Sequence, residues 1–446
     1  MARDLTTGSP MRLIWSFALP TLFGMLFQQF YNMMDTMIVG QLLGASALAS
    51  VGSTSSINFF VIGFCMGVCN GFAIPVAQRM GAGDYSQMRR CVANAGWLSA
   101  LFAVVLTVFT GLFCRTILTV MRTPEDIFDG AYWYILIIFL GIPTTFLYNL
   151  LAAVIRALGD SKTPVYFLAI SSVLNIALDP LLIFVFDMGV AGAAWATIFS
   201  QFVSFCLLLV GCTRGGNLQI HVSRVQLKWD YFSMIIRGGL PSLARQGLAS
   251  FATICLNWAI RPYGDAAIAA MGVVQRIAMF GGSAMIGFGQ GFQPVCGFNY
   301  GAQLYSRVRE GFWFCVKSST VFLLVVSTLG FAFAPQLIAL FRDDPEVVAI
   351  GAVALRCQCV TFCAMGWVTM SNMMLQTIGQ TVPATFLAMA RQGIFFVPLV
   401  WILPLFLGLT GVQITQSASD LLTLACAIPI QLSALRKLSL PDHTKG

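Results

Sequence analysis

Charge is scarce in this sequence. Asp, Glu, Lys and Arg together make up only 9% of the 446 residues, whereas hydrophobic residues make up 58% and the mean hydropathy is +0.83. A soluble globular domain carries roughly 25% charged residues. The composition therefore excludes an ordinary soluble domain and predicts a polytopic membrane protein.

Histidine and catalytic motifs are also scarce. The only two histidines, His221 and His443, lie in polar stretches, and the sequence has no phosphate-binding loop, no nucleophile–base pair and no CxxC pair with a loop histidine. These absences argue against a membrane enzyme and against a self-contained ATP-driven pump. The thirteen cysteines lie mostly in apolar segments, where we expect packing thiols and no disulfide framework.

Long hydrophobic runs dominate what is present. About twelve segments are long enough to cross a bilayer as helices. They are too long and too apolar for the strands of a barrel. We therefore expect an all-α membrane protein with twelve transmembrane helices. The predicted spans are 11–40, 46–78, 92–120, 130–157, 163–186, 190–212, 232–260, 266–298, 312–340, 347–377, 383–408 and 411–435.

The loop charges predict an orientation. With twelve spans, the side that holds both termini collects sixteen Lys and Arg residues, and the opposite side collects only Arg115, Arg122, Arg261 and Arg342. Such an excess marks the cytoplasmic side, so we expect both termini there. These loop residues account for the net charge of +8, so the charge does not indicate a nucleic-acid partner. The N-terminus lacks the charged region and cleavage site of a signal peptide, so we expect the first span to be retained.

The sequence contains an internal repeat, in which its two halves correspond. Ala18-Leu19-Pro20 matches Gly239-Leu240-Pro241, and the correspondence continues at an offset of 220–221 residues through glycines and prolines of all six spans. Six spans per half predict two pseudo-symmetric lobes that enter the membrane from the same side, as in transporters built from parallel repeats. The alternative is a duplication that serves only as scaffold. We expect an N-terminal lobe (1–213), a cytoplasmic linker (214–230) and a C-terminal lobe (231–446).

Acidic residues inside the spans are few and therefore informative. Asp35 lies near the outer end of the first predicted span, and Asp179 lies at a similar depth in the fifth. Asn175 shares a helix face with Asp179, and Thr197 lies at about the same depth in the sixth span. A carboxylate at bilayer depth is costly and usually faces a cavity, a partner or an ion. These oxygens suit Na⁺ or a shared proton, although each acid could instead satisfy helix ends or a buried hydrogen-bond network.

The second half carries basic residues where the first carries acids. It has Arg245, Arg276, Arg356 and Arg391 in or near its spans, but only Asp420 as a membrane-embedded acid. We expect a structural ion pair of Asp420 with Arg391 or Arg245. Attraction of an anionic substrate is the alternative role for these arginines. Because no acid corresponds to Asp35, the sequence places cation coupling in the first half alone.

Two prolines and several methionines suggest mobility. Pro20 and Pro241 lie inside the first span of each half, where proline removes a helical hydrogen bond and loosens the helix. Pro20 could couple a change of charge at Asp35 to bending of that helix. Met33 and Met285 are soft, adaptable side chains that suit a promiscuous cavity, and ordinary packing is the alternative for each.

Several motifs together resemble the multidrug and toxic compound extrusion (MATE) family. The segment Gln29-Phe30-Tyr31-Asn32-Met33-Met34-Asp35-Thr36-Met37-Ile38-Val39-Gly40 is similar to its first-helix signature. Leu174-Asn175-Ile176-Ala177-Leu178-Asp179-Pro180 is similar to its fifth-helix motif. Arg391-Gln392 with Pro398, and Ser419-Asp420-Leu421, are similar to patterns in its last two helices.

The resemblance implies an antiporter that exports cationic or amphipathic compounds in exchange for inward Na⁺ or H⁺, by alternating access between two lobes. For the DinF-like branch of the family, the resemblance implies a cation site at Asp35, Asn175, Asp179 and Thr197. Asn149 is a further candidate for this site. The NorM-like branch would carry further acids in the second lobe, where this chain has Gln246 and Asn372. We expect these two polar residues, with Met33 and Met285, at a substrate cavity.

The expected partners are small amphipathic or cationic molecules and the lipid bilayer. We expect a monomer in the cytoplasmic (plasma) membrane, without a cofactor other than the coupling ion, with Asp35 and Asp179 as ligands if that ion is Na⁺. A lipid or lipid-linked oligosaccharide flippase of the same superfamily is the alternative, because basic residues line the cavity of such proteins.

Overall fold

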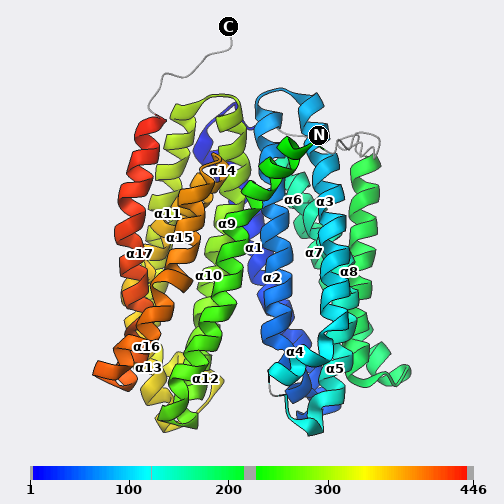
Figure 1. Ribbon diagram of the computed structural model, residues 1–446, viewed down its shortest axis with the longest axis vertical. Helices are drawn as coiled ribbons and strands as arrows, with labels where there is room; N and C mark the ends of the chain where they lie inside the picture. Colours follow the sequence, from blue (N-terminus) through cyan, green and yellow to red (C-terminus); the bar gives the residue numbers. More distant parts are fainter. Residues whose placement is uncertain (1–3, 122, 215–227, 439–446) are drawn as a thin grey trace. The chain divides into compact units, whose positions relative to one another are not determined.

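The protein is helical throughout the ranges that the computed structural model describes, which are residues 4–121, 123–214 and 228–438 (Figure 1). No strand occurs within these ranges. Most of the predicted linker, 214–230, lies outside them.

The described residues of the first half form eight α-helices and one π-helix. Leu181–Val185 forms η1 directly after Pro180, where proline lacks the N–H that would continue a regular α-helix. The helices are α1 (Pro10–Leu43), α2 (Ala45–Gly81), α3 (Tyr85–Leu112), α4 (Cys114–Val120), α5 (Glu125–Leu140), α6 (Ile142–Ala157), α7 (Lys162–Pro180) and α8 (Gly189–Arg214).

The second half repeats this order, with one more break in its fifth span. The elements are α9 (Trp229–Ile260), η3 (Arg261–Tyr263), α10 (Asp265–Gly301), α11 (Tyr305–Ala332), α12 (Ala334–Phe341), α13 (Pro345–Phe362), α14 (Ala364–Thr377), α15 (Thr381–Met389), η4 (Ala390–Ile394), α16 (Phe396–Leu407) and α17 (Leu409–Lys437). The π-helix η4 contains Arg391. Within the described ranges each half thus has one π-helix, a distortion that often marks a functional position in a helix.

All twelve predicted spans are helical. Ten described helices are long and apolar enough to cross a membrane, and α5 with α6 forms an eleventh span that is bent by 45°. The span not among these is α9, where Arg245, Gln246 and Asn257 lower the hydropathy of a 32-residue helix. Its position as the first span of the repeat nevertheless matches that of α1.

The packing repeats with the sequence. Within the first half, α2 packs against α3, α5 and α6, and α8 packs against α5, α6 and α7. Within the second half, α10 packs against α11, α13 and α14, and α17 packs against α13, α14 and α16. The equivalent helices therefore make equivalent contacts, which gives the fold two pseudo-symmetric bundles of six spans.

Two helices belong to both compact units of the chain. One unit comprises residues 1–5 and 23–239, and the other comprises residues 6–22 and 240–446. The first part of α1 thus packs with the second half, and the first part of α9 packs with the first half. Pro20 and Pro241 lie within three residues of the points where α1 and α9 pass from one unit to the other.

Small residues allow these exchanged segments to pack closely. A Cβ atom added to Gly71 of α2 would lie 2.3 Å from the Cα atom of Gly239. At the equivalent crossing in the other unit, a Cβ atom added to Gly291 of α10 would lie 2.3 Å from the Cα atom of Ala18. Since real Cβ atoms do not approach other atoms so closely, only glycine fits at either position.

Acidic residues outside the spans have local structural roles. Asp84, Asp160 and Asp344 each accept hydrogen bonds from backbone N–H groups at the start of the helix that follows, at distances of 2.9–3.4 Å. The backbone N–H groups of the first helical turn would otherwise lack hydrogen-bond acceptors. The capping acids therefore differ in kind from Asp35 and Asp179.

Candidate functional site

The predicted acids lie at similar depths on different helices of the first half. Asp35 lies eight residues before the end of α1, Asp179 lies six residues before the end of η1, and Thr197 lies eight residues after the start of α8. At about 1.5 Å per residue, each is roughly 9–12 Å from its helix end. All three helix ends belong to the compact unit formed by residues 1–5 and 23–239.

The two carboxyl groups lie next to each other. Asp35 is 9% exposed and Asp179 is fully buried. Their side chains are close enough that one carboxyl group, when protonated, forms a hydrogen bond with the other. Two buried carboxylates at this separation repel each other, which favours the uptake of a proton or a cation between them.

An amide and a hydroxyl complete the predicted cluster. The Nδ2 atom of Asn175, four residues before Asp179, donates a hydrogen bond to Oγ1 of Thr197 at 3.3 Å. The Thr197 hydroxyl donates in turn to the carbonyl oxygen of Ala193 at 3.1 Å. Asn175 is 1% exposed. Its amide is oriented by this bond, so that its Oδ1 atom is left for another ligand.

Two tyrosines that were not predicted belong to the same cluster. The Tyr31 side chain is hydrogen-bonded to Thr197 and lies close enough to Asp35 and Asp179 for their charges to act on it. Tyr134 of α5 is 4% exposed and also lies near both carboxyl groups. Tyr31 precedes Asp35 by one helical turn, a spacing that could have identified it. No local pattern identifies Tyr134, which comes from another helix.

Four oxygen atoms of this cluster are buried without a hydrogen-bond donor among the described residues. They are Oδ1 of Asp35, Oδ1 of Asn175, and both Oδ1 and Oδ2 of Asp179. A buried acceptor without a donor costs about 1–3 kcal/mol, and a charged one costs more. Hard cations are bound by carboxylate and amide oxygens, so these atoms fit Na⁺ or, through the carboxyl pair, a proton.

The composition of the cluster limits the ion that it suits. Within the described ranges, no group of three or more His, Cys, Asp and Glu side chains could hold a metal ion. The cluster offers two carboxylates with neutral oxygens, which are ligands for a hard cation and not for a soft transition metal. We call Tyr31, Asp35, Tyr134, Asn175, Asp179 and Thr197 the acidic cluster.

Asn149 makes a local hydrogen bond. Its Nδ2 atom donates to the carbonyl oxygen of Thr145, one turn earlier in α6, at 2.8 Å. The Thr145 hydroxyl donates to Oε1 of Gln201 in α8 at 2.7 Å. This polar contact joins α6 to α8. The role of Asn149 in cation binding remains a prediction.

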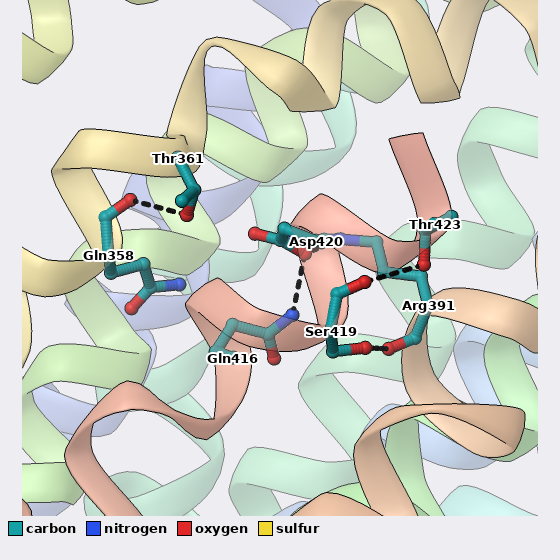
Figure 2. A network of polar contacts seen from close by, with 7 residues as sticks. All are labelled: Gln358, Thr361, Arg391, Gln416, Ser419, Asp420 and Thr423. Carbon is teal, nitrogen blue, oxygen red and sulfur yellow. Dashed lines mark hydrogen bonds and ion pairs between the residues drawn. The ribbon is translucent and has the colours of Figure 1, made fainter. Parts of the chain in front are cut away.

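The second half pairs its embedded acid with an arginine (Figure 2). Nε of Arg391 donates to Oδ1 of Asp420 at 2.8 Å, and Nε2 of Gln416 donates to the same oxygen at 2.8 Å. The Ser419 hydroxyl donates to the carbonyl oxygen of Arg391 at 2.5 Å. These bonds hold η4 against α17, so the pair ties two helices of one bundle together.

Arg245, the other arginine expected near Asp420, has a different partner. Its Nη1 atom donates to Oδ1 of Asn372 at 2.9 Å, and Nδ2 of Asn372 donates to the carbonyl oxygen of Ala384 at 2.6 Å. Arg391 is therefore the residue that pairs with Asp420. The sequence indicated that both arginines lie in or near the spans but not the direction in which each side chain points.

The four residues expected at a substrate cavity have different surroundings. Met33 is 39% exposed and Gln246 is half-buried. Met285 is 1% exposed and packs in a core cluster with Leu323, Phe362 and Met365. Asn372 is 3% exposed and held by Arg245. Packing and hydrogen bonding explain the last two residues without a substrate, and the cavity remains a prediction.

Comparison with known proteins agrees with this architecture. The family model described as MatE matches residues 20–181 and 241–402. The probable multidrug resistance protein YpnP of Bacillus subtilis (strain 168) is 30% identical over 362 residues, which is 80% of each chain. The multidrug export protein MepA of Staphylococcus aureus (strain MSSA476) is 25% identical over 89% of this chain and 88% of its own.

A solved structure shows the same fold. The crystal structure of MATE in complex with MaL6 superposes with a TM-score of 0.90 at 25% identity, covering 98% of both chains. The family model matches each half once, at positions that correspond through the internal repeat. Two repeated bundles of six spans and a family match in each half lead to one conclusion: the chain belongs to the MatE family of multidrug and toxic compound extrusion transporters.

Proposed function

We propose that this protein is a secondary antiporter that exports amphipathic small molecules in exchange for inward Na⁺ or H⁺, with the acidic cluster as the coupling site. The observation that carries the proposal is the set of four buried acceptor oxygens without donors on Asp35, Asn175 and Asp179. The names of the relatives YpnP and MepA, which refer to multidrug resistance and multidrug export, support the substrate class.

The coupling follows from electrostatics. With both carboxyl groups ionised, the cluster holds two negative charges at bilayer depth, where each charge is costly. One proton or one Na⁺ removes half of that charge and satisfies the orphaned oxygens. The loaded and unloaded cluster therefore favour different arrangements of α1, α5, α7 and α8, and a ligand can shift a conformational equilibrium by its differential affinity for the two states.

The export cycle in this proposal uses alternating access between the two bundles. A cation entering from outside loads the acidic cluster and favours release of substrate to the outside. Its discharge to the cytoplasm resets the transporter. We place the protein in the plasma membrane as a monomer with both termini in the cytoplasm, which the loop charges support, and closer to the DinF-like branch, because Gln246 and Asn372 replace second-lobe acids.

A transport assay in proteoliposomes tests the proposal. Wild type should move an amphipathic dye when either a Na⁺ or a pH gradient is imposed, and Asp35→Asn and Asp179→Asn should lose the gradient-driven component. Asp187→Asn is the matched control, because Asp187 is an exposed acid near the same membrane surface. Gradient-driven transport at the wild-type rate by Asp35→Asn would refute the assigned coupling site.

The flippase alternative depends on the arginines of the second half. Arg391 is neutralised by Asp420. Nε of Arg356 donates to the carbonyl oxygen of Phe331 at 3.2 Å, and its guanidinium lies 5.5 Å from the centroid of the Phe331 ring, a cation–π contact. Arg276 is exposed. Arg245 is half-buried, and its hydrogen-bond partner, Asn372, carries no charge.

A further inference from the structure

Arg245 lies in the middle of a spanning helix. It follows the start of α9 by sixteen residues and precedes its end by fifteen. A charged side chain at this depth is costly to insert, so it normally faces a partner, a cavity or a ligand. Half-buried, the Arg245 side chain keeps part of its surface accessible.

The partner that Arg245 has is neutral. Oδ1 of Asn372 accepts from Nη1 of Arg245, and the amide nitrogen of Asn372 is committed to the carbonyl oxygen of Ala384. The Asn372 amide is thereby fixed with its oxygen toward the arginine. This contact orients the guanidinium and leaves its positive charge uncompensated.

No carboxylate in the described part of the chain pairs with Arg245. Asp420, the embedded acid of this half, is bound by Arg391 and Gln416. A guanidinium presents five N–H donors in a planar fork that matches carboxylate, phosphate and sulfonate groups. The chain thus supplies an oriented, uncompensated anion-binding group at bilayer depth.

We infer that Arg245, positioned by Asn372, binds an anionic group on the transported amphiphile, so that the preferred substrates carry a carboxylate, phosphate or sulfonate. This inference rests on the proposed transport function and specifies its substrate class. A zwitterionic or anionic amphiphile is favoured over a simple cation, because a positive charge beside Arg245 would be repelled. Arg245 contacts the substrate, and Asn372 is a positioning residue.

Equilibrium binding of two dyes tests this inference. Rhodamine B carries a free carboxylate, and its ethyl ester has the same ring system with the carboxylate blocked. Wild-type protein in detergent should bind rhodamine B more tightly than the ester. Arg245→Gln should weaken rhodamine B binding by roughly tenfold or more, because it removes a charge-assisted hydrogen bond to the carboxylate. Binding of the ester should change less than twofold.

The remaining variants separate charge from folding. Arg245→Lys should retain part of the preference, because it keeps the charge but loses the planar fork. Arg276→Gln, an exposed arginine of α10, is the matched control and should bind both dyes as wild type does. Ester binding reports that a variant is folded. Equal affinity for the two dyes in wild type, or an unchanged ratio in Arg245→Gln, would overturn the inference.

Two further conditions identify the source of the anionic group and keep the test independent of coupling. The binding of both dyes is also compared in nanodiscs of phosphatidylglycerol and of phosphatidylcholine. Loss of the Arg245-dependent preference in phosphatidylglycerol alone would show that a lipid headgroup occupies the site. A preference retained in both would show that a free solute does. Dye binding is measured without a gradient, so the two predictions are independent. The predicted dye preference can be absent while Asp35→Asn still abolishes coupled transport, and the preference can be present while Asp35→Asn transports normally.

Discussion

At the scale of single residues, burial and partners distinguish three kinds of acid. Asp84, Asp160 and Asp344 cap helices, Asp420 is neutralised by Arg391, and Asp35 with Asp179 has neither cap nor cation among the described residues. A carboxylate that already has its cation gains little from another one. The acids with orphaned oxygens are therefore the ones suited to bind a mobile cation.

The Arg391–Asp420 pair should stabilise the protein without setting its coupling. Asp420→Asn removes a bond to a charged group and leaves a guanidinium that is 20% exposed without its partner. We expect unfolding in detergent to become easier by about 1–3 kcal/mol. Thermal unfolding followed by size-exclusion chromatography measures this change, and gradient-driven transport per folded molecule should stay near wild type.

A double-mutant cycle completes this experiment. Arg391→Gln combined with Asp420→Asn should be less destabilised than the sum of the two single variants, because no unpaired charge remains. Strict additivity would show that the pair does not interact energetically. A loss of coupling in Asp420→Asn would move part of the cation site into the second half.

The sequence predicts depth along a helix better than direction around it. Asp35, Asn175, Asp179 and Thr197 could be assigned to one level by counting residues from the span ends, and the structure brings them into one cluster. Tyr134 was not predicted, because its position depends on how α5 packs against other helices. For the same reason the sequence left open whether Arg391 or Arg245 meets Asp420.

At the scale of helices, two glycine crossings should be critical. Gly71→Ala and Gly291→Ala place a methyl group where the neighbouring backbone already lies. We expect each to destabilise the protein by about 1–3 kcal/mol through overpacking. Gly52→Ala in α2 and Gly272→Ala in α10 are matched controls, because a Cβ atom there meets nothing within 4 Å. Equal thermal stability of all four variants would contradict this packing.

The turn between α10 and α11 carries backbone strain that its repeat partner avoids. Gln303 has a φ of 61°, whereas glycine, Gly83, occupies the equivalent turn in the first half with a φ of 75°. A residue with a side chain loses roughly 1–2 kcal/mol in this left-handed region. Gln303→Gly should therefore raise the unfolding temperature and Gly83→Gln should lower it. The opposite order would show that side-chain contacts of Gln303 outweigh the strain.

At the scale of the whole molecule, α1 and α9 connect the two compact units. Each helix passes from one unit to the other within three residues of its proline. Pro20→Ala and Pro241→Ala restore a helical hydrogen bond near these passages and stiffen them. We expect slower transport with unchanged equilibrium binding of the dyes. Wild-type rates and substrate range in both variants would show that bending at the prolines is not needed.

The sequence predicted much of the architecture but not this exchange of segments. Hydropathy indicated the twelve spans, and the repeat of glycines and prolines indicated two equivalent bundles. The residues between Pro10 and Leu22 are as apolar as those that follow them, so nothing in their composition indicates which bundle they join. That assignment depends on the close approach of Ala18 to Gly291, a contact between segments far apart in the sequence.

The most direct test of the account measures gradient-driven accumulation and gradient-free counterflow of the same substrate in one set of proteoliposomes. If Asp35 and Asp179 couple the cation to transport, Asp35→Asn and Asp179→Asn should lose accumulation under a Na⁺ or pH gradient and keep substrate counterflow. Asp187→Asn should retain both activities. Accumulation by the two cluster variants at the wild-type level would contradict the account.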